Sequence, residues 1–195
     1  MLEGDTLLCD TKETSWANPS NKKRFINKLS NTLKENGFET LYAADDVYCL
    51  NVKTARSLEK EKVTAVVGED TDLLVLLLYH VQPERCNAFF ASSTKNAAKI
   101  WDIKAVMPTL GVDICDNILF GHAIGGCDTT SSLFLIGKDL PLKKLKESPL
   151  FRNHAKAYAT KSISQAKVLE AEEKALVLLY GGKIDDCLNT LRHVE

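Results

Sequence analysis

The sequence predicts an α/β protein, a three-layer sandwich with a mainly parallel central sheet and a helical extension at its C-terminal end. The first observation is a short apolar, β-branched run at residues 63–67, which is typical of a strand buried on both faces of a parallel sheet. The second is the alternation of such strands with stretches of helical periodicity. The third is a set of acidic residues placed where apolar elements end, and ligands bind at the carboxyl ends of parallel strands.

Length and composition are those of an ordinary globular chain. Its 195 residues suffice for one domain with a substantial core, and a net charge of −1 gives by itself no argument for a polyanionic partner. The amino terminus lacks a signal-peptide pattern, and the longest apolar run, residues 73–79, is too short to span a bilayer. The cysteines form no CxxC pair and most have apolar neighbours, which favours buried reduced thiols and an intracellular compartment. They are Cys9, Cys49, Cys86, Cys115, Cys127 and Cys187.

Two helices and a strand are expected before the central strand. Residues 1–17 show no clear periodicity and are expected to form an irregular leader. Asn18-Pro19 is a helix start signal, and the apolar face that follows ends at Gly37. Residues 38–43 predict a strand, and the acidic pair Asp45-Asp46 separates it from a helix over residues 47–62.

More elements are expected directly after the central strand. Residues 73–79 are apolar on all sides, which indicates an interior helix or a second buried strand. Residues 87–91 and 99–103 predict two short strands around a polar turn. Residues 103–110 predict a helix interrupted near Pro108.

The last third of the chain is predicted to be helical. Residues 114–124 predict one helix that runs into Gly125-Gly126, where two glycines let the backbone approach closely. A basic stretch follows, then an amphipathic helix over residues 164–180 and a short final one. We therefore expect residues 18–137 to form the α/β core and residues 138–195 to pack on it.

Three carboxylates, Glu69, Asp70 and Asp72, arrive within four residues of the central strand. Their mutual repulsion and desolvation are costly, so at least one pKa should be raised and a divalent cation should offset the cost. The alternative is that Asp70 caps the next helix while Glu69 is solvated. Asp46 and Asp128 are also placed at the ends of apolar elements.

Other reactive side chains give weaker patterns. No histidine has a partner at catalytic spacing, and His122 is interpreted as a packed core residue. Cys127 is interpreted as a small buried side chain rather than a nucleophile. Trp101 and the pair Phe89-Phe90 are assigned to the core rather than to base stacking. No Walker or Rossmann glycine fingerprint is present.

Two motifs carry a resemblance to a known family. The segments Glu69-Asp70-Thr71-Asp72 and Gly126-Cys127-Asp128 resemble the Glu-Asp-x-Asp and Gly-Cys-Asp motifs of PIN-like nucleases of the flap endonuclease type. The longer string over residues 120–132 is similar to an uncharacterised, often transposon-associated animal subgroup of this family. The resemblance covers residues 18–145 and implies a PIN-like fold that is truncated at its N-terminus.

The resemblance also implies a chemistry. In that family, carboxylates at the C-terminal sheet edge hold two divalent metals that cleave phosphodiester bonds. It implies catalytic and metal-binding roles for Asp46, Asp70, Asp72 and Asp128, with Glu69 as a further ligand to Mg²⁺ or Mn²⁺. Four carboxylates would hold one ion well and a second poorly.

A basic segment follows the second motif. Lys138, after Gly137, falls where the family has the glycine hairpin of its DNA-gripping helix-turn-helix. Together with Lys143, Lys144 and Lys146 it is a candidate for neutralising backbone phosphates, although such a run is usually just a solvated surface.

The sequence departs from the family pattern at three places. Tyr48 falls where the family has its second helix acid, and a phenol does not ligate magnesium as a carboxylate does. Nothing before residue 18 matches the family's first strand and its leading aspartate. Leu135 stands where the family has the first glycine of its hairpin.

Two functions follow from these patterns. The first is a metal-dependent nuclease, active or degenerate, that acts on nucleic acid as a monomer. DNA is favoured over RNA as its substrate, and the nucleus over the cytoplasm as its location. The second is a catalytically inactive PIN-like module that binds nucleic acid or protein. Tyr48 and the missing first strand favour the second function. Asp70, Asp72 and Asp128 favour the first, because a purely structural role would not require all three.

Overall fold

A computed structural model gives the fold and describes residues 17–58, 61–81, 87–94, 97–160 and 162–191. The chain divides into two compact units, Met1–Val47 and Tyr48–Glu195, and each is described here by itself. The expected leader at residues 1–17 lies, apart from Ala17, outside the described residues. No helix in the described ranges is long and apolar enough to cross a lipid bilayer.

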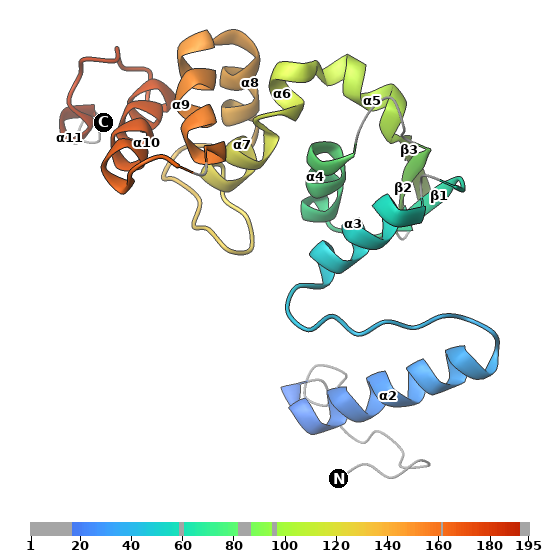
Figure 1. The fold of residues 1–195 in the computed structure, drawn as a ribbon. Coiled ribbons are helices and arrows are strands. Elements are labelled where there is room, and N and C mark those ends of the chain that lie inside the picture. Colours follow the sequence, from blue (N-terminus) through green and yellow to red (C-terminus); the bar gives the residue numbers. More distant parts are fainter. Residues whose placement is uncertain (1–16, 59–60, 82–86, 95–96, 161, 192–195) are drawn as a thin grey trace. The chain divides into compact units, whose positions relative to one another are not determined.

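The N-terminal unit is built on helix α2, Pro19–Glu35 (Figure 1). Its start is the predicted one, because the Asn18 side chain accepts hydrogen bonds from the backbone N–H groups of Ser20 and Asn21 while Pro19 occupies the first turn. The helix ends before Gly37, whose φ of 83° lies in the left-handed region that glycine adopts without strain.

The strand predicted at residues 38–43 is wrong, because this segment is extended but belongs to no sheet. Its apolar side chains remain exposed, Phe38 by 62% and Leu41 by 58%. Side chains tie it to α2 instead: the Ser30 and Thr40 hydroxyls are 2.8 Å apart. A segment rich in apolar and aromatic residues forms a strand only where a neighbouring strand pairs with its backbone, and the described part of this unit offers none.

The second unit contains a three-stranded sheet in the order β1, β2, β3, with bounds Thr64–Val67, Ala88–Thr94 and Ala97–Asp102 (Figure 1). The first pair is parallel and the second antiparallel. The predicted strands at 87–91 and 99–103 are thus confirmed, and the α/β class with them. The sheet is small and mixed, however, rather than the larger, mainly parallel sheet expected.

Strand β1 is less buried than its sequence predicts. Only Val66 is buried among its four residues, whereas Val67 is 73% exposed. The expectation of burial on both faces is therefore wrong. β1 is an edge strand, since among the described residues it pairs with β2 alone.

Two helices join the sheet in one core. Helix α3, Val47–Leu58, buries Val52 and Ala55, and stops short of the predicted end at residue 62. Helix α4, Thr71–His80, connects β1 to its parallel partner β2 and buries Leu73 and Leu77. The all-apolar stretch at residues 73–79 is therefore an interior helix, the first of the two predicted alternatives. The core also contains Phe90, whose ring centroid is 5.7 Å from that of Trp101, as predicted.

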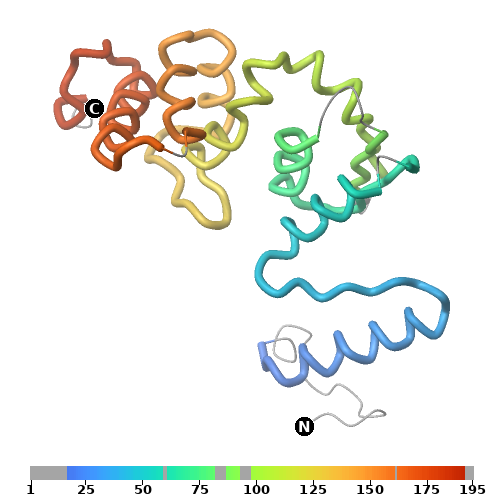
Figure 2. The backbone as a smooth tube through the Cα atoms, in the orientation of Figure 1, coloured from blue at the N-terminus to red at the C-terminus, as the bar shows by residue number. Residues whose placement is uncertain are grey.

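A second core lies among the C-terminal helices. These are α5 (Ile103–Leu110), α6 (Val112–Cys115), α7 (Ile118–Ile124), α8 (Asp139–Glu147), α9 (Pro149–Ala159), α10 (Gln165–Leu179) and α11 (Leu188–Leu191). Its centre is made of fully buried side chains of α8, α9 and α10, such as Leu145, Phe151 and Val177. Helix α7 contacts both α8 and α4, so it joins this core to the first one. A long loop leads from α7 to α8 (Figure 2).

Two helix predictions need correction. Helix α5 runs through Pro108 to Leu110 without the expected interruption. The single helix expected over residues 114–124 is divided into α6 and α7. The break falls at Asn117, a buried residue whose side-chain amide donates to the Asp113 carbonyl at 2.8 Å. An asparagine side chain competes with the backbone for such carbonyls, and this ends α6.

The loop before α8 provides a test of local strain. Leu135 has a φ of 60°, the one positive value among the non-glycine residues described, and its side chain is 84% exposed. A residue with a Cβ atom destabilises the folded state by about 1–2 kcal/mol in the left-handed region. Glycine removes this strain, but its greater freedom in the unfolded chain lowers the free energy of unfolding by about 0.5–1 kcal/mol. Leu135→Gly should therefore raise the free energy of unfolding, by up to about 1 kcal/mol, in urea denaturation.

The adjacent Phe134 supplies the matched control. It is 80% exposed and does not have a positive φ. Phe134→Gly should lower the free energy of unfolding, because only the entropic cost of glycine remains. Equal effects of the two substitutions would contradict the assignment of strain to Leu135.

Candidate metal centre

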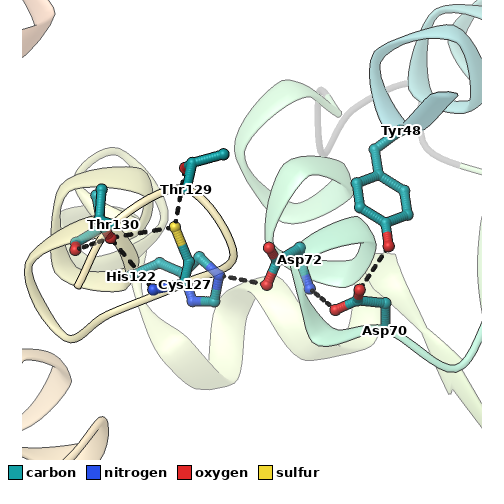
Figure 3. Close-up of polar contacts among 8 residues, drawn as sticks. Tyr48, Asp70, Asp72, His122, Cys127, Thr129 and Thr130 are labelled. Carbon is teal, nitrogen blue, oxygen red and sulfur yellow. Dashed lines mark hydrogen bonds and ion pairs between the residues drawn. The ribbon is translucent and has the colours of Figure 1, made fainter. Parts of the chain in front are cut away.

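The candidate centre draws on three parts of the second unit: the first turn of α3, the N-terminus of α4, and α7 with the turn behind it (Figure 3). Asp70 and Asp72 come from α4, and His122, Cys127 and Asp128 from α7 and its following turn. Because α4 packs against α7, residues about fifty positions apart in sequence become neighbours.

Asp70 is held by two hydrogen bonds, one to each of its carboxylate oxygens. Oδ1 accepts the backbone N–H of Asp72 at 2.9 Å, so Asp70 is the N-cap of α4. Oδ2 accepts the Tyr48 hydroxyl at 2.5 Å. The capping alternative is thus confirmed, and it is compatible with metal binding because each oxygen keeps a further lone pair.

These contacts shift two pKa values in opposite directions. The hydrogen bond to Asp70 raises the pKa of Tyr48 to about 12, and the charges of Asp128 and Asp72 add to the effect. The hydrogen bond from Tyr48, followed by that from the Asp72 N–H, lowers the pKa of Asp70. The raised pKa expected from crowded carboxylates is therefore not found at Asp70, because the two hydrogen-bond donors outweigh the effect of desolvation there.

Asp72 has a different partner. Its Oδ1 lies 2.7 Å from Nε2 of His122, and both side chains are only 17% exposed. The interpretation of His122 as a packed core residue is therefore wrong, because its ring is half-buried and forms a polar contact. No spacing along the chain indicates this pair, since the contact depends on how α4 and α7 pack.

The turn after α7 positions Cys127 and Asp128. Gly126 has a φ of 90°, and a Cβ built on it would lie 2.8 Å from the Cα of Ser132, so only glycine fits there. The Cys127 N–H donates to the Thr130 hydroxyl at 3.2 Å, and that hydroxyl donates to the Ala123 carbonyl at 2.7 Å. These bonds fix the turn against the end of α7.

Cys127 is half-buried rather than fully buried, which corrects the interpretation of this residue as a core side chain. Its Sγ lies 3.3 Å from the hydroxyl oxygens of both Thr129 and Thr130, and these contacts lower the pKa of the thiol. The general expectation of buried cysteines holds for Cys115 but is wrong for Cys187 and for Cys49, which are exposed. Cys9 and Cys86 lie outside the described residues.

Two overlapping groups of side chains have the spacing of metal ligands. In the first, Asp70, Asp72 and Asp128 each offer a carboxylate oxygen within 4.8 Å of the others. In the second, Asp72, His122 and Cys127 offer oxygen, nitrogen and sulfur atoms within the same limit. The convergence predicted for three of the four aspartates is thereby confirmed.

The remaining predicted site residues stand apart from these groups. Glu69 is exposed and belongs to neither group among the described residues. Asp46 lies in the N-terminal unit, so its role as a ligand stays a prediction. Lys138 precedes α8, and its charge contributes to lowering the pKa of Asp70, which places its ammonium group within electrostatic reach of the carboxylates. Lys143 and Lys146 are exposed and Lys144 is half-buried, all on α8.

Comparison with known proteins yields no relative. No protein-family model, curated protein or solved structure matches the chain.

The Tyr48–Asp70 hydrogen bond gives a pH-dependent prediction. The pKa of Asp70 is lowered on folding, so its contribution to stability is present above the unfolded value of about 3.9 and is lost as the pH falls through the folded value. The pKa of Tyr48 is raised to about 12, so its contribution is present below the unfolded value of about 10 and is lost as the pH rises through about 12. Tyr48→Phe should therefore destabilise most between about pH 5 and pH 9, as measured by urea denaturation across the pH range.

Tyr42→Phe is the control for this prediction, because the Tyr42 hydroxyl contacts an uncharged amide oxygen of Asn27 at 3.4 Å. The change in the free energy of unfolding caused by Tyr42→Phe should not depend on pH at acidic pH values. A destabilisation by Tyr48→Phe that is as large at about pH 3 as at pH 7 would show that the hydrogen bond to the charged carboxylate contributes nothing.

Proposed function

We propose that this protein is a divalent-metal-dependent nuclease-like domain that hydrolyses phosphodiester bonds in nucleic acid. The observation that supports the proposal most directly is the convergence of Asp70, Asp72 and Asp128, with ligand oxygens within 4.8 Å of one another. Three carboxylates at one point repel each other unless a cation compensates their charge. The proposal includes the finer PIN-like fold, a three-layer sandwich that lacks the family's first strand.

The donor set fits Mg²⁺ or Mn²⁺, which prefer carboxylate oxygens. The protein also holds the donors in place before an ion binds. Asp70 is oriented by the cap hydrogen bond and by Tyr48, and Asp72 by His122. Such hydrogen bonds from a second layer of residues fix ligand direction and tune affinity.

A bound ion in such a site activates water for attack on phosphorus and stabilises the leaving oxygen. The residues of the chain have separate tasks. Asp70, Asp72 and Asp128 bind and orient, and Lys138 attracts the phosphate adjacent to the carboxylates. The exposed lysines Lys143 and Lys146 extend this positive charge along α8, away from the carboxylates, as a track for the nucleic-acid backbone.

A second function, a catalytically inactive module that binds nucleic acid or protein, is favoured by one observation. The Tyr48 hydroxyl donates to Asp70 at 2.5 Å, at the position where the resembling family has a carboxylate. A neutral phenol there removes one negative charge and occupies a lone pair of Asp70. Both effects weaken cation binding, so loss of activity with retention of the fold is the expected result if this function is correct.

Metal binding is tested first by thermal stability. Mn²⁺ at about 100 times its dissociation constant should stabilise the folded chain by about 2.7 kcal/mol and raise the Tm by several degrees. Asp128→Asn removes one ligand from the carboxylate group and should abolish most of this gain. Asp185→Asn, which changes an exposed acid outside both groups, should leave the gain unchanged.

The nuclease is then supported, rather than the binding module, if the wild-type chain cleaves branched DNA with Mn²⁺ and Asp72→Asn does not. Tyr48→Asp separates the two functions further, since the added carboxylate should tighten Mn²⁺ binding. The nuclease proposal fails if millimolar Mn²⁺ leaves the melting curve of the wild-type chain unmoved. If Mn²⁺ raises the Tm only in Tyr48→Asp, the wild-type chain is the catalytically inactive module.

The basic segment gives an independent prediction. Replacing Lys143, Lys144 and Lys146 by Gln should weaken DNA binding and reduce the slope of log Kobs against log salt by up to about one unit for each lysine that contacts a phosphate. Fluorescence anisotropy at several salt concentrations measures both quantities. Lys167→Gln on α10 is the control, and an unchanged slope in the triple variant would assign α8 to ordinary surface.

A further inference from the structure

We propose that Asp72, His122 and Cys127 form a second cation site, specific for a thiophilic transition-metal ion of the Zn²⁺ class. This site goes beyond the proposed function, because its donors select a different kind of metal. It shares Asp72 with the carboxylate group, and its other two ligands, His122 and Cys127, do not belong to that group.

The geometry brings the three donors together from two helical segments. Asp72 lies in the first turn of α4, His122 on α7, and Cys127 in the turn after α7 (Figure 3). Their ligand atoms lie within 4.8 Å of one another, and all three side chains are half-buried. The site is thus partly shielded from solvent.

The chemical types of the three ligand atoms determine which metal ion the site selects. Magnesium and calcium avoid thiol sulfur, whereas zinc takes cysteine sulfur, histidine nitrogen and aspartate oxygen in one tetrahedral shell. Three protein ligands leave the fourth position of a tetrahedron to water, the pattern of an open site rather than of a closed structural one. Irving–Williams order also favours such ions over Mg²⁺ at nitrogen and sulfur donors.

The surroundings of Cys127 support a role as ligand. The Thr130 hydroxyl already donates to the Ala123 carbonyl, so the Thr129 hydroxyl, 3.3 Å from Sγ, is the one that is able to donate to a thiolate. The turn that carries Cys127 is fixed by the positive φ of Gly126 and by the Cys127–Thr130 hydrogen bonds. A ligand held in this way loses little conformational freedom when it binds.

Binding requires a small rearrangement. Nε2 of His122 and Oδ1 of Asp72 are 2.7 Å apart, at hydrogen-bond distance. In a tetrahedral zinc site with bonds of about 2.0 Å, nitrogen and oxygen ligands are separated by about 3.3 Å. The ion would therefore replace the hydrogen bond between the two side chains, which would move slightly apart.

The test uses Co²⁺ with the full chain, because a thiolate ligand gives cobalt a charge-transfer absorption band. The wild-type protein should show this band, and one equivalent of Zn²⁺ should remove it. Cys127→Ser and His122→Gln should each weaken Co²⁺ binding at least tenfold. Cys187→Ser is the matched control, since Cys187 is also a free thiol next to a threonine but lies outside both metal groups.

Asp128→Asn separates this proposal from the proposed function. It should keep the cobalt band while losing the stabilisation by Mn²⁺, whereas Asp72→Asn should lose both. A second measurement needs no variant: Zn²⁺ should slow the alkylation of Cys127 in the wild-type chain, as read by peptide mass spectrometry. The proposal is overturned if the band survives in Cys127→Ser or if Zn²⁺ leaves the alkylation rate of Cys127 unchanged.

Discussion

The contact between α4 and α7 is the constraint on which the candidate centre depends. It places Oδ1 of Asp72 at 2.7 Å from Nε2 of His122 and brings the turn with Cys127 and Asp128 beside the N-terminus of α4. Neither helix carries a complete ligand set by itself. Because α7 also packs on α8, where a Cβ at Gly121 would meet Leu145, the position of the site follows from the packing of both cores.

Tyr48 shows how one neutral hydrogen-bond donor changes the electrostatics of the carboxylate group. The phenol satisfies one oxygen of Asp70 and lowers its pKa, and the carboxylates raise the pKa of Tyr48 in return. The pair thus has one hydrogen bond, and one negative charge fewer than two carboxylates would have at the same place. A cation therefore gains less from binding here than it would beside a fourth carboxylate.

Asp72 belongs to both groups of potential ligands, and this sharing links two classes of metal. With Asp70 and Asp128 it offers only oxygen, which suits a hard cation. With His122 and Cys127 it offers oxygen, nitrogen and sulfur ligands together, which suit a cation of intermediate softness such as Zn²⁺. The side chain of Asp72 is 17% exposed, so either ion would be partly shielded from water and its interactions would be stronger than at an open surface.

The sequence by itself determined the local features: the α/β class, the Asn18 cap of α2, the strands β2 and β3, and the placement of acids beside β1. These follow from periodicity and capping, which act within a few residues. Tertiary structure decided the rest. Residues 38–43 form no strand because no neighbour pairs with them, and the partners of Asp72 and Asp70 come from α7 and α3. Such contacts depend on how helices pack, which no spacing along the chain encodes.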